Sequence, residues 1–124
     1  MSASGPADVL ASRPAIRVDA AVAQRIAELS HGRPLVIDYY ASRGCCVTVG
    51  DLRVGFEDPD LAANVVELAP IGGVRVFALR QLLDVLSTGG EVKLGGPSFA
   101  RRPWVALDRP EAWLEFLDLH PYRH

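Results

Sequence analysis

The sequence predicts an α+β domain in which short β-strands alternate with three helices. Runs of valine, isoleucine and leucine that alternate with polar residues predict the strands. Longer segments with apolar residues three and four positions apart predict the helices, and glycine or proline separates most elements. A chain of 124 residues, 49% of them hydrophobic, suits one globular domain. We expect residues 1–14, rich in Ser, Ala, Gly and Pro, to form a flexible N-terminal arm and residues 15–124 to form that domain.

The first helix is predicted over residues 20–30. Asp19 has the residue type of an N-cap, and Gly32 follows the segment closely. Apolar residues recur on one helical face, at Val22, Ile26 and Leu29. This pattern is typical of an amphipathic helix that packs one face against a core. His31, directly before Gly32, is expected to interact with the carboxyl end of this helix.

Two more helices are predicted further along the chain. Residues 79–86 carry four leucines on one helical face, and the segment ends before Gly89. Asp108 is the predicted N-cap of a C-terminal helix with Pro110 in its first turn. The residues of that helix expected to face the core are Trp113, Leu114 and Leu117.

The strand that precedes the cysteines is predicted over residues 35–40. This apolar run is broken only by Asp38, and its length and β-branched content favour a buried strand. Side chains alternate along a strand, so one of Tyr39 and Tyr40 is expected to face inward and the other outward. Further strands are predicted at residues 15–18, 65–69, 74–77, 91–94 and 104–107, and an acidic loop at residues 57–64.

A β-hairpin is predicted around the only two cysteines, Cys45 and Cys46. The alternation of apolar and polar residues changes phase at Gly50–Asp51, which predicts a two-residue turn there. The expected apolar face carries Cys45, Val47 and Val49, and the expected polar face carries Cys46, Thr48 and Arg53. The two thiols could then reach a common target only if the chain leaves strand geometry at Gly44, where glycine permits a bend.

The charge distribution indicates neither nucleic acid nor membrane as a partner. The net charge is −2, the pI is near 5.9, and the 13 basic residues are spread along the chain. Arg101 and Arg102 are interpreted as a surface turn, with a stacking contact to a ligand or partner as the alternative. No apolar run reaches the roughly 20 residues that span a bilayer, and residues 1–13 lack the pattern of a secretion signal. We therefore expect a cytoplasmic location, where thiols stay reduced.

The cysteine pair is the main candidate functional site. Soft metals and iron–sulfur clusters are bound by thiolates, usually four per site. One chain offers two, so such a site would need a second subunit or a further ligand, for which His31, His120 and Asp38 are candidates. A thiol redox switch would use the same pair, and so would simple packing of Cys45 as a small apolar residue.

Several stretches of the chain carry a family resemblance. They are Ile16–Ala21 with Ile26–Leu29, then Arg43–Cys45, then Gly73–Phe77 leading into Leu79–Leu86. In order and character, over roughly residues 15 to 95, the chain resembles the HesB/IscA-like family of A-type iron–sulfur carrier proteins. The resemblance implies a HesB-like fold of mixed, mainly antiparallel β-sheets with an N-terminal amphipathic helix, a short central helix and a C-terminal helix. It also implies that Cys45, after the glycine turn, is a cluster ligand.

The chain departs from those carriers near its carboxyl end. The carriers have two more ligands in a Cys-Gly-Cys there, whereas this chain reads Gly95-Gly96-Pro97. The paired Cys45 and Cys46 after Gly44, with His31–Pro34 upstream, instead resemble a group of small bacterial proteins encoded beside aldehyde dehydrogenases. A further cysteine that those proteins carry after the pair is missing from this sequence. This second resemblance implies an accessory role beside a partner enzyme.

Two functional hypotheses follow. In the first, the chain is a non-enzymatic protein that binds a metal ion or an iron–sulfur cluster at the interface of a homodimer. Its ligands would be Cys45 and Cys46, with His31 as a third candidate. In the second, it is an accessory protein for a partner enzyme such as an aldehyde dehydrogenase, with structural or redox-responsive thiols and with residues 104–117 as an aromatic contact surface. A thiol enzyme is a further alternative.

Overall fold

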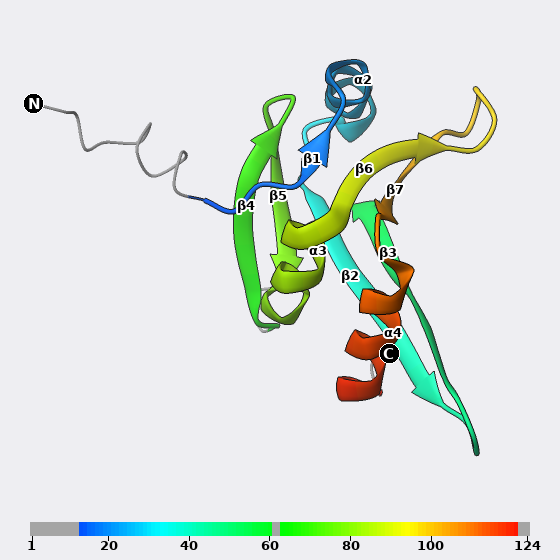
Figure 1. The fold of residues 1–124 in the computed structure, drawn as a ribbon. Coiled ribbons are helices and arrows are strands. Elements are labelled where there is room, and N and C mark those ends of the chain that lie inside the picture. The colour runs from blue at the N-terminus through cyan, green and yellow to red at the C-terminus, as the bar shows by residue number, and fades with distance from the viewer. Residues whose placement is uncertain (1–12, 61–62, 122–124) are drawn as a thin grey trace, which may run out of the picture.

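The computed structural model describes residues 13–60 and 63–121 of the chain. In chain order the elements are β1 (Arg17–Val18), α2 (Ala20–Ser30), β2 (Leu35–Arg43), β3 (Thr48–Phe56), β4 (Val65–Ile71), β5 (Val74–Leu79), the 3-10 turn η1 (Arg80–Leu82), α3 (Leu83–Gly89), β6 (Gly90–Gly95), β7 (Arg102–Leu107) and α4 (Pro110–Leu119) (Figure 1). Residues 1–12 of the predicted arm lie outside the described residues, as do residues 61 and 62 of the predicted acidic loop.

The strands form two sheets. One has the order β1-β6-β7 and the other the order β3-β2-β5-β4. Three of the pairings are antiparallel, whereas β1 with β6 and β2 with β5 are parallel. The fold is therefore α+β with mainly antiparallel sheets, and the strands predicted outside the cysteine region are present within a few residues of their expected ends.

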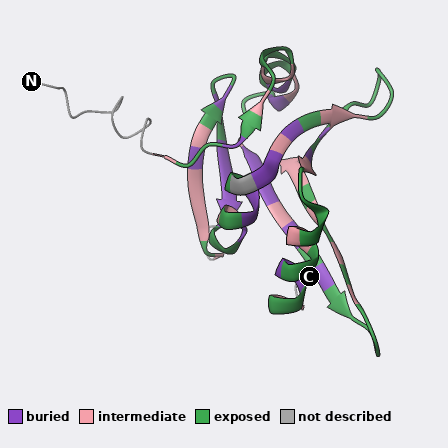
Figure 2. Cartoon of the chain, viewed as in Figure 1, coloured by how far each residue is buried: buried purple, intermediate pink, exposed green. Residues whose placement is uncertain are grey.

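The hydrophobic core lies between the two sheets and the helices that cover them (Figure 2). Its fully buried side chains include Ile26 from α2, Leu35 and Ile37 from β2, and Val92 from β6. Each buried side chain of this size contributes roughly 1.5–3 kcal/mol. β2 supplies the core with its first residues and then continues beyond the core toward the cysteines, which makes it the element that positions the candidate site.

Helix α2 occupies the residues that the periodicity predicts. Asp19 caps it, because its carboxylate accepts a hydrogen bond from the Ala21 amide over 3.1 Å. The helix passes very close to the turn between β4 and β5, where a Cβ on Gly72 would lie 2.3 Å from the Ala23 carbonyl oxygen. His31 follows in the left-handed region, with φ 50°, and turns the chain toward β2.

The predicted turn at Gly50–Asp51 is wrong. Both residues lie inside the continuous strand β3, which pairs with β2 from Leu35 opposite Phe56 to Arg43 opposite Thr48. Burial in β3 alternates without a change of phase, and Gly50 takes one of the inward positions. The glycine is needed there for packing, since a Cβ would lie 2.9 Å from the Leu117 Cδ2 atom and 2.3 Å from the Tyr40 carbonyl oxygen.

The other two helices differ from expectation at their ends. The helix predicted over residues 79–86 begins one residue later with η1, because Leu79 still pairs with Val65 in the sheet, and α3 continues to Gly89. Asp108 is not the N-cap of α4. Its carboxylate accepts a hydrogen bond from the Arg17 guanidinium over 2.7 Å, and the N-cap residue is Arg109.

Helix α4 packs Trp113 and Leu117 against the core as predicted, but the third residue on that face is Phe116 rather than Leu114. Phe116 and Leu117 are buried and Trp113 is half-buried, whereas Leu114 is 62% exposed. Residues 113, 116 and 117 are three and four positions apart and share one face, and Leu114 lies outside it. Of the helices in the described ranges, none has the length and apolar content that a membrane crossing requires.

Candidate functional site

The cysteines lie at the tip of the β2–β3 hairpin. β2 ends at Arg43, and the Gly44 amide donates a hydrogen bond to the Val47 carbonyl oxygen over 2.8 Å, which closes the turn before β3. Figure 1 shows the hairpin extending past α4, so that its tip stands away from the rest of the molecule. Figure 2 shows the tip as exposed. The actual hairpin turn is therefore Gly44–Val47, and it contains both cysteines.

The two thiols lie side by side. The Cys46 Sγ donates a hydrogen bond to the Cys45 Sγ over 3.3 Å, and both residues are exposed. The thiols were expected on opposite faces if the strand extended back to the cysteines, and this condition is not met, because neither cysteine belongs to a strand. The chain does leave strand geometry at Gly44, which is the condition under which both thiols can reach one target.

Apolar side chains next to the pair are also exposed. Val47 is 61% exposed and Val49 is 55% exposed. They were expected on the apolar face of a hairpin that packs on the core, and that expectation is wrong, because the inward positions of β3 are the alternate ones, beginning at Thr48. The tip thus presents two thiols and two valines to its surroundings.

The other candidate ligands lie elsewhere. His31 precedes β2 and the cysteines follow it, so nine strand residues at about 3.3 Å each, roughly 30 Å, separate them. Asp38, on the same strand, pairs with the Arg53 guanidinium at 3.8 Å, and the His120 ring lies 4.4 Å from the Phe116 ring. Among the described residues there is no group of three or more His, Cys, Asp or Glu side chains that could hold a metal ion.

The two tyrosines of β2 face opposite ways, as predicted. Tyr39 is 1% exposed, and its hydroxyl accepts a hydrogen bond from the Gln81 Nε2 over 2.8 Å. The Trp113 and Phe116 rings contact it edge-on, with centroid separations of 6.0 and 5.0 Å. Tyr40 is exposed and carries the Arg53 guanidinium 5.9 Å from its ring centroid. These contacts anchor the middle of the hairpin under α4 and leave the tip free.

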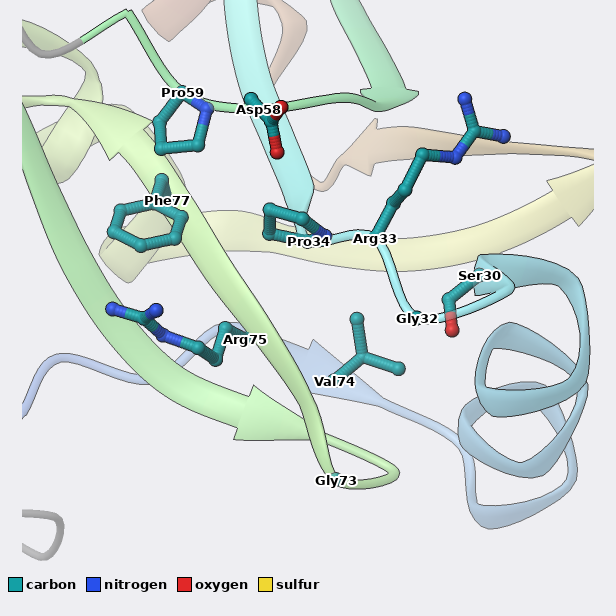
Figure 3. Close-up of a pocket in the computed structure, with 10 residues that line it drawn as sticks. All are labelled: Ser30, Gly32, Arg33, Pro34, Asp58, Pro59, Gly73, Val74, Arg75 and Phe77. Atoms are coloured by element: carbon teal, nitrogen blue, oxygen red, sulfur yellow. The ribbon is translucent and has the colours of Figure 1, made fainter.

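A cavity of about 590 Å³ lies at the opposite end of β2 from the cysteines. It opens between the end of α2 and the β4–β5 turn, and Arg33, Arg75 and Phe77 are among the residues that line it (Figure 3). Its lining includes neither a cysteine nor a histidine among the described residues. The cavity and the thiol pair are therefore two separate features of the molecule.

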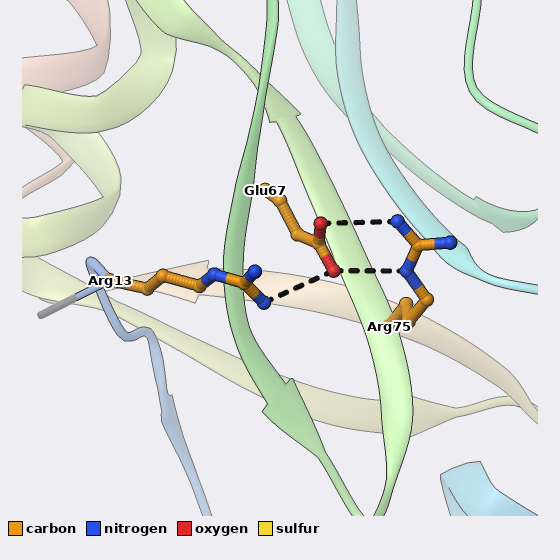
Figure 4. Close-up of polar contacts among 3 residues, drawn as sticks. All are labelled: Arg13, Glu67 and Arg75. Carbon is orange, nitrogen blue, oxygen red and sulfur yellow. Dashed lines mark hydrogen bonds and ion pairs between the residues drawn. The ribbon is translucent and has the colours of Figure 1, made fainter. Parts of the chain in front are cut away.

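An arginine–glutamate cluster holds the start of the domain to the outer strand. The Glu67 carboxylate accepts two hydrogen bonds from the Arg75 guanidinium, over 3.0 and 3.1 Å, and pairs with Arg13 at 3.2 Å (Figure 4). These hydrogen bonds from Arg75 lower the pKa of Glu67 below its usual value, with the charge of Arg13 contributing in the same direction. The same interaction raises the pKa of Arg75. This cluster stabilises the sheet edge and lies on β4 and β5, away from the thiols.

The chemistry open to the hairpin tip is that of an accessible dithiol. Thiolates are the ligands that zinc, copper(I) and iron–sulfur clusters prefer. A disulfide between neighbours is unfavourable, because consecutive Cα atoms are about 3.8 Å apart whereas disulfides usually join Cα atoms about 4.4–6.8 Å apart. Two thiols leave a tetrahedral site half filled, so a bound metal would take its remaining ligands from outside this chain.

Comparisons with known proteins give no family for this chain: no protein-family model matches it, and no curated protein matches it significantly.

Proposed function

We propose that this protein is a non-enzymatic, cytoplasmic metal- or iron–sulfur-binding protein whose Cys45–Cys46 pair binds its metal between two copies of the chain. The observation that supports this proposal is the convergence of two exposed thiols, 3.3 Å apart, at the end of a projecting hairpin. Reduced thiols persist in the cytoplasm, which is where such a site would stay available for a metal.

The number of ligands supports a homodimer. A tetrahedral zinc site or an iron–sulfur cluster commonly takes four thiolates, and two hairpin tips supply four. His31 lies roughly 30 Å from the pair along β2, so it is not part of the proposed ligand set within one chain. Both cysteines are exposed in each chain, so the thiols of two hairpin tips are accessible to one another.

The surroundings of the thiols suit such a contact. Val47 and Val49 would be removed from water when two tips meet, at roughly 25 cal/mol for each Å² of apolar surface buried. Apolar neighbours also limit the access of water to a metal site. The glycine–cysteine turn between two strands is the feature shared with the HesB/IscA-like carriers, and the proposal extends their cluster-binding role and HesB-like fold to this chain.

The test is the metal content of protein purified without oxygen from cells supplied with iron and zinc. We expect about one zinc site or one cluster for each two chains, measured as zinc, iron and acid-labile sulfide. The Cys45→Ser/Cys46→Ser double variant should lose that metal, and the Ser42→Ala variant, altered at an exposed residue of the same tip, should keep it. Absence of zinc, iron and sulfide from the unaltered protein would end the proposal.

A second candidate function is an accessory protein that binds a partner enzyme of the aldehyde dehydrogenase class. The observation in its favour is a groove of about 450 Å³ between β7 and α4, at which Trp104 is 46% and Leu114 is 62% exposed. Binding to a purified aldehyde dehydrogenase from the same organism, lost in Trp104→Ala/Leu114→Ala and kept in Cys45→Ser/Cys46→Ser, would favour this function over the first.

A further inference from the structure

Three arginines line a groove of about 290 Å³ that is formed by segments far apart in the sequence. Arg33 comes from the segment between α2 and β2, Arg101 immediately precedes β7, and Arg102 is the first residue of β7. The apolar residues that line the groove include Leu29 and Phe56. None of the residues that line this groove, in the part of the chain that the structure describes, is acidic.

The three arginines differ from most others in the molecule. Six arginines each have a carboxylate within 4.0 Å: Arg13, Arg17, Arg25, Arg53, Arg75 and Arg109. Arg80 donates a hydrogen bond to the Asn64 side chain. Among the described residues, the side chains of Arg33, Arg101 and Arg102 have neither an ion pair nor a hydrogen bond, and only exposed Arg43 at the hairpin tip shares that state. Of the four arginines without such a partner in the described part of the chain, three therefore line one groove.

Arg33 lines this groove as well as the larger cavity, and Figure 3 shows its side chain extending away from Phe77 and Arg75. Arg101 also lines an adjacent hollow together with Arg25 and Lys93, each of which has a carboxylate within 4.0 Å. Like charges gathered at one groove repel one another, and no acidic residue among those that line the groove offsets them.

Guanidinium groups have a planar fork of donors that matches a phosphate group, which they bind through paired, charge-assisted hydrogen bonds. A volume of about 290 Å³ lies just below the roughly 300–1,000 Å³ typical of small-molecule sites, so the groove suits only a compact ligand. We propose that the groove formed by Arg33, Arg101 and Arg102 is a binding site for a small phosphate-bearing molecule. This site is independent of the thiol pair and of the function proposed for it.

The experiment is a calorimetric titration of the full chain with pyrophosphate, with sodium chloride at equal ionic strength as the reference. Saturable binding of pyrophosphate is expected, and each of Arg33→Gln, Arg101→Gln and Arg102→Gln should weaken the affinity about tenfold, the effect of losing a charge-assisted hydrogen bond. Arg109→Gln is the matched control. It removes the same charge at the opposite end of β7, where Arg109 pairs with Glu111, and should leave the affinity unchanged.

Three outcomes overturn the proposal: no saturable heat with pyrophosphate, an equal response to sodium chloride, or an affinity that Arg109→Gln weakens as much as the groove substitutions do. Each altered arginine is exposed, so the variants should fold, and their melting curves without ligand establish that they do. As a second measurement, pyrophosphate should raise the melting temperature of the unaltered chain and of Arg109→Gln, because a ligand that binds only the folded state stabilises it. An equal rise in the Arg33→Gln/Arg101→Gln/Arg102→Gln variant would also contradict the site.

Discussion

The indole Nε1 of Trp113 donates a hydrogen bond to the Gly50 carbonyl oxygen over 3.3 Å, across 63 positions of the sequence. The contact joins α4 to β3 close to the first residues of the strand. Beside it, the Leu117 side chain occupies the space that a Cβ on Gly50 would need. The last helix therefore holds the hairpin at Gly50, and the tip that carries the cysteines projects beyond this attachment (Figure 1).

Substitution of Gly50 tests this attachment. A Cβ in Gly50→Ala would lie 2.3 Å from the Tyr40 carbonyl oxygen, a backbone atom that cannot move aside easily. We expect a loss of about 2–3 kcal/mol in the free energy of unfolding, the usual cost of overpacking, measured by urea denaturation. In the control Gly44→Ala the nearest atom is the Val47 carbonyl oxygen at 3.7 Å, an ordinary contact, and the change should stay within about 0.5 kcal/mol. Equal effects of the two substitutions would contradict the described packing.

The hydrogen bond between Gln81 and Tyr39 predicts a second difference. Tyr39→Phe keeps the buried ring and its contacts with Trp113 and Phe116 but removes the hydroxyl that accepts from Gln81. A loss of about 1 kcal/mol in the free energy of unfolding is expected. Tyr40→Phe makes the same chemical change at an exposed ring and should be nearly neutral. Denaturation curves of both variants measure the two losses in free energy of unfolding. A larger loss for Tyr40→Phe than for Tyr39→Phe would show that the inward and outward rings are assigned wrongly.

The Glu67 cluster predicts a pH dependence of stability. Because the folded-state pKa of Glu67 lies below the usual 4.5, its contribution is complete above that value and is lost as the pH falls through the folded-state pKa. Glu67→Gln should therefore be less stable than the unaltered chain at neutral pH, and the difference should shrink as the solution is acidified below pH 4.5. Thermal unfolding across this range measures it. A difference that grows on acidification would have the wrong sign for this cluster.

The exposure of both thiols predicts how they react. Iodoacetamide should alkylate Cys45 and Cys46 in the native, metal-free protein without denaturant, because neither sulfur is covered by the domain. If the pair binds zinc as proposed, added zinc should protect both residues together, with the modified sites counted by mass spectrometry. Magnesium, which prefers oxygen ligands, is the control ion and should give no protection. Alkylation at the same rate with zinc as without it would count against metal binding by the pair.

Local patterns predicted most of the fold correctly. The alternation of residues 65–69, 74–77, 91–94 and 104–107 placed four strands, and the spacing of Val22, Ile26 and Leu29 placed α2. The failures occur where distant segments meet. Gly50–Asp51 has the chemistry of a turn, yet α4, some 60 residues later, requires a glycine inside a strand at that point. Leu79 continues a leucine pattern but is retained in the sheet by its pairing with Val65.

The candidate site was predictable in part. The presence of the cysteine pair and the end of the strand at Gly44 follow from the sequence, because a glycine before two cysteines marks a place where strand geometry can end. The exposure of the tip could not be predicted from the local sequence, because that exposure depends on where α4 covers the hairpin. Arg101 and Arg102 belong to the exposed segment expected of them. Nothing in the local pattern indicates that Arg33 joins them at a groove.

The most direct test of the proposed metal-binding function is native mass spectrometry of the protein purified without oxygen. A mass equal to two chains plus zinc or an iron–sulfur cluster is expected, together with a metal-free single chain for Cys45→Ser/Cys46→Ser. A metal-free single chain from both the unaltered protein and the Ser42→Ala control would contradict the account.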